Sequence, residues 1–239
     1  MPKTLAPTRP TMSYLSTYLK EIVYGGNDGI ITTFAVVAGF TGAAVDVRIL
    51  PVFTVLLFGF ANLFADGVSM ALGDLLSSRS QSDVYSNEKQ KELKKIRDNP
   101  DAQFQETIRL LESKGFKQEK AQEFATLLRS NESYWVEFMM DQDVRLPNTA
   151  NQNNIWMAVV TFISFVGFGV IPLLPYLLFR NISSVFMISC VFTVIAMLSL
   201  GVLRWRATGH ALTRTVGETV VIGGLAAIVA YLVGGAFHI

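Results

Sequence analysis

Residues 155–179, IWMAVVTFISFVGFGVIPLLPYLLF, carry no charged side chain in 25 consecutive positions. A helix of about 20 apolar residues crosses the hydrocarbon core of a bilayer, so this stretch is long enough to span one. Residues 181–203 are likewise uncharged, and residues 215–239 contain Glu218 as their only Asp, Glu, Lys or Arg. These three runs predict a membrane protein whose C-terminal part consists of transmembrane helices.

The composition of the whole chain agrees with this prediction. Apolar residues make up 51% and charged residues 16% of the 239 positions, whereas soluble domains carry about 25% charged residues. The 20 basic and 19 acidic residues leave a net charge of +1, so no bulk charge attracts the chain to nucleic acid. The single cysteine, Cys190, excludes a disulfide framework and a paired-cysteine metal site.

Two further apolar runs lie upstream and contain acidic residues. Residues 22–45 include Asp28, and residues 51–77 include Asp66 and Asp74. With them we predict an all-α membrane protein of five transmembrane helices. The expected segments are an N-terminal interfacial segment at 1–21, with an amphipathic helix over 11–24, spans 1 and 2 at 22–77, an insert at 78–154, and spans 3 to 5 at 155–239.

The insert between the second and third spans is polar and nearly neutral, with 12 basic and 13 acidic residues. Asn99 followed by Pro100 predicts a helix start, and Gly115 a helix end. We expect three helices, from Pro100 to Gly115, over 117–129 and over 132–143. Because no glycine-rich linker follows Ser77, the second span is expected to continue into the insert as one helix beyond Gln90.

The distribution of Lys and Arg predicts the topology. Eighteen of these residues fall in the N-terminal segment, the insert and the 204–214 turn, and two, Arg48 and Arg180, fall in the opposite turns. Basic residues favour the cytosolic side, so the N-terminus and insert are expected in the cytosol and the C-terminus outside or in a lumen. No organelle signal is visible, so the sequence does not select between a plasma or inner membrane and a vacuole.

The second run places four polar or sulfur-bearing side chains on one helical face. They are spaced four residues apart and comprise Asn62, Asp66, Met70 and Asp74. Charges within a spanning segment are costly and by default mark a site or pathway. Carboxylates suit hard cations, and an added thioether favours a softer transition metal. With Asp28, this stripe is the candidate transport pathway; packing is the alternative for Met70 and helix capping for Asp28.

Several short motifs carry a family resemblance. NDGIITTF at 27–34 with VAG at 37–39, DGVSMALGD at 66–74, GVIPLLP at 169–175, and the pair Met139-Met140 stand in this order along the chain. They resemble the first three spans and the insert of the vacuolar iron transporter family. The resemblance covers almost the whole chain from about Tyr18 onward.

That family consists of homodimers that export cytosolic Fe²⁺, and often Mn²⁺, in exchange for protons. The resemblance therefore implies a homodimer in the lipid bilayer that binds protons and divalent metal as transported substrates, with no permanently bound cofactor. It also implies a transport site on the first two spans and a cytosolic insert that gathers metal. The matching positions are Asp28 and Met70 in the spans, and Glu92, Glu106, Met139, Met140 and Asp143 in the insert.

At three other positions where the family pattern has a carboxylate, this chain has a different residue. Asn62 replaces the family's second-span Glu, and Asp66, about 6 Å further along the helix, is expected to take over as an unpaired acid that binds metal or a proton. Lys95 and Gln103 replace two carboxylates of the insert. The chain is therefore not expected to hold a reservoir of several metal ions there, and at most one cation site remains.

Three functions compete on these observations. The leading one is a proton-coupled exporter of Fe²⁺ or Mn²⁺. The second is a structural or metal-binding membrane protein of the same fold with weakened transport. The third is an intramembrane aspartyl enzyme using Asp28, Asp66 or Asp74, which would need two acids sharing one proton and a glycine-rich motif that we do not find. We therefore predict a transporter and not an enzyme.

Overall fold

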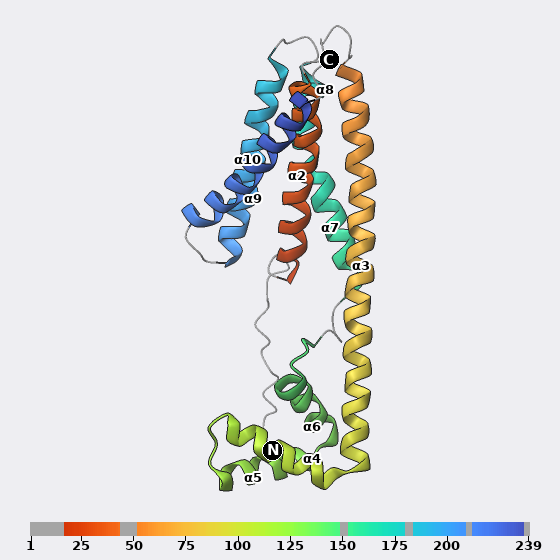
Figure 1. The fold of residues 1–239 in the computed structure, drawn as a ribbon, viewed down its shortest axis with the longest axis vertical. Coiled ribbons are helices and arrows are strands. Elements are labelled where there is room, and N and C mark those ends of the chain that lie inside the picture. The colour runs from red at the N-terminus through yellow and green to blue at the C-terminus, as the bar shows by residue number, and fades with distance from the viewer. Residues whose placement is uncertain (1–16, 44–51, 149–152, 180–183, 209–211, 237–239) are drawn as a thin grey trace, which may run out of the picture. The chain divides into compact units, whose positions relative to one another are not determined.

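The computed structural model describes residues 17–43, 52–148, 153–179, 184–208 and 212–236. These residues form helices joined by short connections, and none of them lies in a strand, which confirms the all-α prediction (Figure 1). The elements are α2 (Leu19–Gly42), α3 (Val52–Asp98), α4 (Pro100–Ser113), α5 (Gln118–Arg129), α6 (Glu132–Met139), the π-helix η1 (Met140–Val144), α7 (Asn154–Gly169), the 3₁₀-helix η2 (Ile171–Leu173), α8 (Leu174–Leu178), α9 (Val185–Thr208) and α10 (Leu212–Ala236).

The chain divides into two compact units. The first comprises residues 1–75 and 155–239, and the second comprises residues 76–154. Helix α3 belongs to both, because it runs without a break for 47 residues. This confirms the expectation that the second apolar run continues as one helix beyond Gln90.

Four described helical stretches are long and apolar enough to cross a membrane. They are Val52–Asp98, Asn154–Leu178, Val185–Ala207 and Val216–Ala236, and they match the second to fifth expected spans. Helix α2 has 24 residues but is not one of the four, since Asn27, Asp28 and several glycines lower the hydropathy of its first half. A multi-pass membrane protein is thus supported. The first expected span, over α2, stays a prediction.

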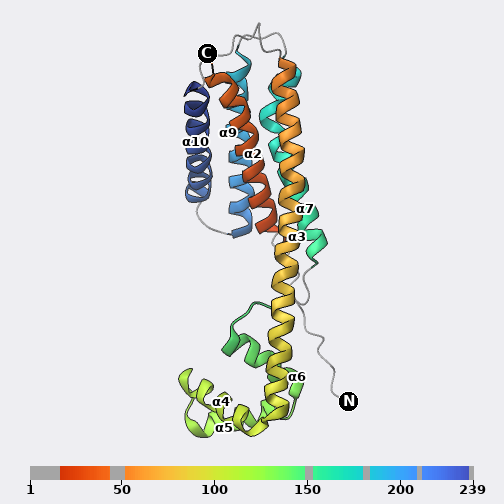
Figure 2. The same ribbon diagram turned by 45° about the vertical axis from the view of Figure 1, so that its right-hand side comes forward.

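Helix α2 is the central helix of the first unit. Helices α9 and α10 lie on one side of it, and α7 and α3 on the other (Figure 2). Ile30 packs with Leu200 of α9, and Val37 packs with Val55 of α3 and Leu173 of η2. Apolar side chains on opposite faces of α2 therefore bind it to both groups of helices, as van der Waals packing does between helices in a bilayer.

Glycines let α2 and α7 approach at backbone distance. A Cβ atom on Gly25 would lie 2.6 Å from the Thr161 carbonyl oxygen, and a Cβ atom on Gly29 would overlap the Phe165 carbonyl. On the facing helix, a Cβ atom on Gly169 would lie 2.8 Å from the Gly29 carbonyl oxygen. The sequence NDG thus places Asp28 beside the crossing point of two closely packed helices.

Two prolines interrupt the apolar run from Ile155 to Phe179. Helix α7 ends at Gly169, and the chain continues through η2 and the short α8 because Pro172 and Pro175 cannot donate backbone hydrogen bonds to a continuous α-helix. The Ser189 hydroxyl of α9 donates to the Pro172 carbonyl at 2.7 Å. A neighbouring helix thus satisfies a carbonyl oxygen at the break, as a membrane environment demands.

The N-terminal helix differs from its expected form within the described residues. Residues 11–16 of the expected amphipathic helix lie outside the described part of the chain. Leu19 to Tyr24 form the first turns of α2 and continue it without a break. The helical periodicity there therefore extends the predicted first span by several residues.

The second unit contains the three expected insert helices. The Asn99 side chain accepts a hydrogen bond from the Ala102 backbone at 3.2 Å, and Asn131 caps α6 in the same way through Tyr134. Gly115 has φ of +97°, a conformation that glycine adopts without strain. The third helix ends as a π-turn after Met139 instead of continuing as an α-helix to Asp143.

The core of the second unit is built from α3, α4, α5, α6 and η1. One buried cluster comprises Tyr85, Ile96, Leu128, Trp135, Val136, Met139 and Met140. A second comprises Ile108, Leu111, Ala121 and Ala125. The amphipathic stripe expected on residues 117–129 supplies buried residues to both clusters, which confirms its periodicity.

Candidate functional site

The structure brings together the two acids that the sequence analysis placed on separate spans. Asp28 of α2 and Asp66 of α3 are half-buried, and they lie close enough for their negative charges to repel each other. The two helices contact each other further along, where the rings of Phe40 and Phe58 are 5.9 Å apart. Two like charges in a low-dielectric environment favour uptake of a cation or a proton between them.

Asp66 is not the unpaired acid that we expected. The Asn62 side-chain amide donates to Asp66 Oδ2 at 2.7 Å, because the two residues are one helical turn apart on the same face. An amide donor stabilises a carboxylate without neutralising it. Asn62, which stands where the family has a Glu, therefore orients the carboxylate of Asp66, which we expect to act in place of that Glu.

The remaining members of the stripe lie on the same half-buried face of α3. Met70 and Asp74 are half-buried, whereas the large apolar side chains of Phe64, Val68 and Leu72 are about half exposed. The Thr161 hydroxyl of α7 lies 2.9 Å from Asp74 Oδ2 and donates to that carboxylate. The stripe thus faces neighbouring helices of its own unit, and the apolar residues face outward.

Glu21 is a candidate that the sequence analysis missed. It falls in the segment expected to form an amphipathic helix at the membrane interface, but its side chain is 3% exposed. Its Oε2 atom has no hydrogen-bond partner among the described residues. Glu21 precedes Asp28 by seven residues, which puts both acids on one face of α2, about 10 Å apart along the axis. That spacing was the available signal.

A cavity of about 580 Å³ lies at the far end of the stripe. It is bounded by α2, α3 and α10, and Asn62 supplies one of its few polar groups. The acids of α3 thus lead from Asp74 through Asp66 to a cavity at Asn62.

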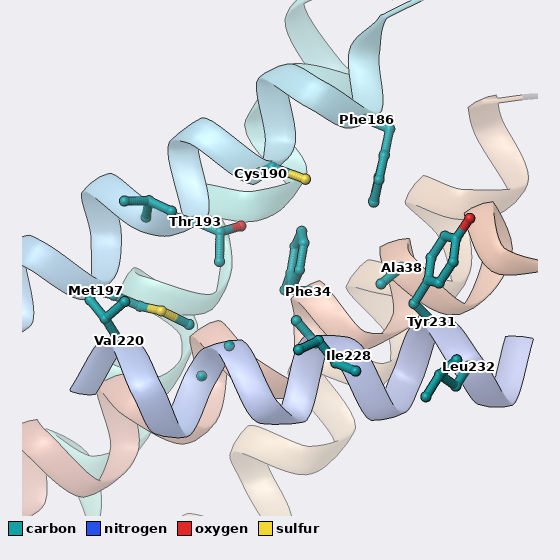
Figure 3. Close-up of a pocket in the computed structure, with 14 residues that line it drawn as sticks. Phe34, Ala38, Phe186, Cys190, Thr193, Met197, Val220, Ile228, Tyr231 and Leu232 are labelled. Carbon is teal, nitrogen blue, oxygen red and sulfur yellow. The ribbon is translucent and has the colours of Figure 1, made fainter. Parts of the chain in front are cut away.

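A second cavity, of about 370 Å³, lies between α2, α9 and α10 and is almost wholly apolar. Phe34, Phe186 and Tyr231 point into it (Figure 3). None of its lining residues carries a carboxylate, so it offers a divalent cation no charged ligand. We therefore place the candidate site at the acid stripe and not in this cavity.

The insert residues do not converge as an open cation site. Met139 and Met140 are 0% and 1% exposed and belong to the hydrophobic core. Glu92 is 1% exposed, and its carboxylate accepts hydrogen bonds from Lys95 and Gln103, while Glu106 and Asp143 are exposed. Among the described residues, no group of three or more His, Cys, Asp or Glu is arranged to hold a metal ion.

Comparisons with known proteins give the chain a family. The sequence model of the VIT family matches residues 19–235. Vacuolar iron transporter 2 of Oryza sativa subsp. japonica is 32% identical over 213 residues, which is 89% of this chain and 85% of that protein. The vacuolar iron transporter of Toxoplasma gondii is 30% identical over 228 residues, covering 92% of this chain and 74% of that protein.

A third relative, vacuolar iron transporter 1 of Arabidopsis thaliana, is 30% identical over 213 residues, or 89% of this chain. The matched residues include α2 with Asp28, the whole acid stripe of α3, and the insert. This agreement over nearly the full length confirms the resemblance drawn from the motifs. The chain therefore belongs to the VIT family.

Proposed function

We propose that this protein transports a divalent transition metal, Fe²⁺ or Mn²⁺, out of the cytosol in exchange for protons. The observation that carries the proposal is the pair of mutually repelling carboxylates on α2 and α3 in a chain whose relatives are named vacuolar iron transporters. A half-buried pair of carboxylates on two spanning segments favours uptake of a proton or a metal ion. Exchange of one for the other at this pair is the coupling step.

The pathway follows the acids in order of depth. Glu21 lies in the first turn of α2, and Asp74 lies where the part of α3 in the first unit ends; the two helices run antiparallel in that unit (Figure 1). Asp28, Met70 and Asp66 follow, and their carboxylates and thioether form a donor set suited to a soft-to-borderline divalent ion. The ion then passes Asn62 into the cavity between α2, α3 and α10.

We also propose that two copies of the chain assemble through α3, with the insert and N-terminus in the cytosol. Four small residues form an exposed stripe on α3, adjacent to the acid stripe: Ala61, Ala65, Ser69 and Gly73. Small residues at such spacing let helices in a bilayer approach closely. Eighteen Lys and Arg residues would lie on the insert's side of the membrane and two on the other, which supports the cytosolic location.

The decisive experiment measures Fe²⁺ and Mn²⁺ flux into proteoliposomes under an imposed proton gradient. We expect Asp66→Asn to lower flux by about tenfold or more, as loss of a metal-site residue does, with folding retained because an amide oxygen still accepts from Asn62. Adding Asn62→Glu to this variant restores a carboxylate one turn away and partly rescues flux. Asp83→Asn is the matched control, since it removes an exposed acid from the same helix.

The control variant is expected to transport like the parent protein. Full flux by Asp66→Asn would show that Asp66 is only a buried structural acid and would overturn the proposed pathway. Flux that persists without a proton gradient and leaves internal pH unchanged would retain metal transport but remove the exchange with protons.

A further inference from the structure

A buried carboxylate in the second unit pairs with a lysine of its own helix, whose side chain is 58% exposed. Glu92 of α3 is 1% exposed, and a buried charge is stable only when it is paired and hydrogen-bonded. Its Oε2 atom lies 2.9 Å from the Lys95 ammonium, and its Oε1 atom accepts from the Gln103 side chain. Both oxygens of Glu92 are therefore engaged by groups of this chain.

The Lys95 ammonium also serves two other acids. Glu106 of α4 and Asp143 of η1 act on it electrostatically in addition to Glu92. The hydrogen bond to Glu92, together with these negative charges, raises the pKa of Lys95 against the opposing effect of partial burial. Lys95 thus forms an ion pair with Glu92 and is within electrostatic reach of Glu106 and Asp143.

The polar contacts continue from Glu92 into the core of the unit. The Gln103 side chain donates to Glu92, and the Gln103 backbone carbonyl accepts from the Thr107 hydroxyl at 2.8 Å. Thr107 Oγ1 accepts from Trp135 Nε1 at 2.9 Å and lies 3.5 Å from Met139 Sδ. A Glu92 oxygen, Thr107 Oγ1 and Met139 Sδ are thereby linked in one network of polar contacts.

We propose that Lys95 is a built-in cation that takes the place of a bound divalent metal in the acidic cluster of the insert, so that this insert folds without metal and does not collect metal ions. A divalent ion approaching Glu92 would have to displace the ammonium from one oxygen and would meet an N–H group of Gln103 at the other. The transport stripe in the first unit is then the metal-binding region of the chain.

The test counts Mn²⁺ bound per chain in the full-length protein in detergent by equilibrium dialysis. Lys95→Gln removes the internal cation and is expected to bind additional Mn²⁺, since carboxylate oxygens suit this ion. Lys94→Gln is the matched control, because it makes the same change of charge at the neighbouring position, which is exposed as Lys95 is. The transport stripe is common to all variants, so a difference between them reports on the insert.

The added binding should disappear when Glu92→Gln is combined with Lys95→Gln, and Lys95→Arg, which keeps the charge, should show none. Unchanged Mn²⁺ binding by a folded Lys95→Gln variant would overturn the proposal. Two measurements on the insert do not depend on that variant. Glu92→Gln alone should leave Mn²⁺ binding unchanged, and EDTA should leave hydrogen exchange of α4, α5 and α6 in the parent unchanged.

Loss of Mn²⁺ binding in Glu92→Gln, or metal-dependent protection of these helices, would show that the insert binds metal despite Lys95. Neither result bears on the transport stripe, because flux through Asp28 and Asp66 is measured separately. Failure of this inference therefore leaves the proposed transport function standing.

Discussion

At the residue scale, one hydrogen bond sets the character of the acid stripe. Asn62 donates to Asp66 at 2.7 Å, so the carboxylate is oriented by a neutral partner. A Lys or Arg in this position would neutralise the acid permanently, as Lys95 does for Glu92 in the insert. The partners of the two acids thus differ. Asp66 in the stripe has a neutral amide as its partner, and Glu92 in the insert has an ammonium.

The Trp135 indole provides a residue-scale prediction for stability. Its N–H donates to Thr107 Oγ1 at 2.9 Å in a fully buried environment, so Thr107→Val leaves a buried donor without a partner. We expect a loss of about 1–3 kcal/mol in local stability, measured as faster hydrogen exchange in α4 and α6. Thr126→Val is the control, because that exposed hydroxyl donates only to its own helix, and it should leave exchange unchanged. Equal exchange in the two variants would contradict this role of Thr107.

At the element scale, the crossing of α2 and α7 depends on the absence of side chains. A Cβ atom on Gly29 would overlap the Phe165 backbone, and backbone cannot move aside as a flexible side chain can. We expect Gly29→Ala to destabilise the first unit by about 1–3 kcal/mol, the usual effect of overpacking, and to lower flux because it displaces Asp28. Thermal unfolding in detergent and the flux assay measure the two effects.

Gly167→Ala is the matched control for this crossing. A Cβ atom on Gly167 would meet nothing within 4 Å, and alanine favours a helix over glycine by about 1 kcal/mol. This variant should therefore be as stable as the parent or slightly more stable. If Gly29→Ala unfolds at the same temperature as Gly167→Ala, close packing of α2 on α7 is not required.

At the scale of the whole molecule, the distribution of Lys and Arg predicts a topology that can be tested directly. In a Cys190→Ala background, we expect a cysteine at Asn87 in the insert to react with membrane-impermeant maleimide only from the cytosolic side. A cysteine at Ile239 should react only from the opposite side, because an odd number of spans separates it from the insert. An insert cysteine labelled only from outside would contradict the predicted orientation. Labelling of both cysteines from the same side would show that the number of spans between them is even. This test does not address α2, which precedes both positions.

Much of the architecture can be predicted from the sequence, because it depends on interactions between residues that are close together in the chain. Uncharged runs of about 20 residues predict spans, and Asn99 with Pro100 predicts a helix start that the structure confirms. The spacing of Asn62, Asp66, Met70 and Asp74 predicts one half-buried face of α3, which the structure also shows. Each of these features depends on residues within a few turns of one another, so periodicity and hydropathy are sufficient to find them.

Other features depend on contacts between elements that are distant in the sequence. Burial of Glu21 results from the packing of α2 against its neighbours, and neither its identity nor its immediate neighbours indicate it. The acids that act electrostatically on Lys95 come from α3, α4 and η1, and only the folding of the insert brings α4 and η1 near it. Hydropathy and helical spacing are set within a segment, whereas the burial of a charged side chain and its contacts with other helices depend on which helices pack around it.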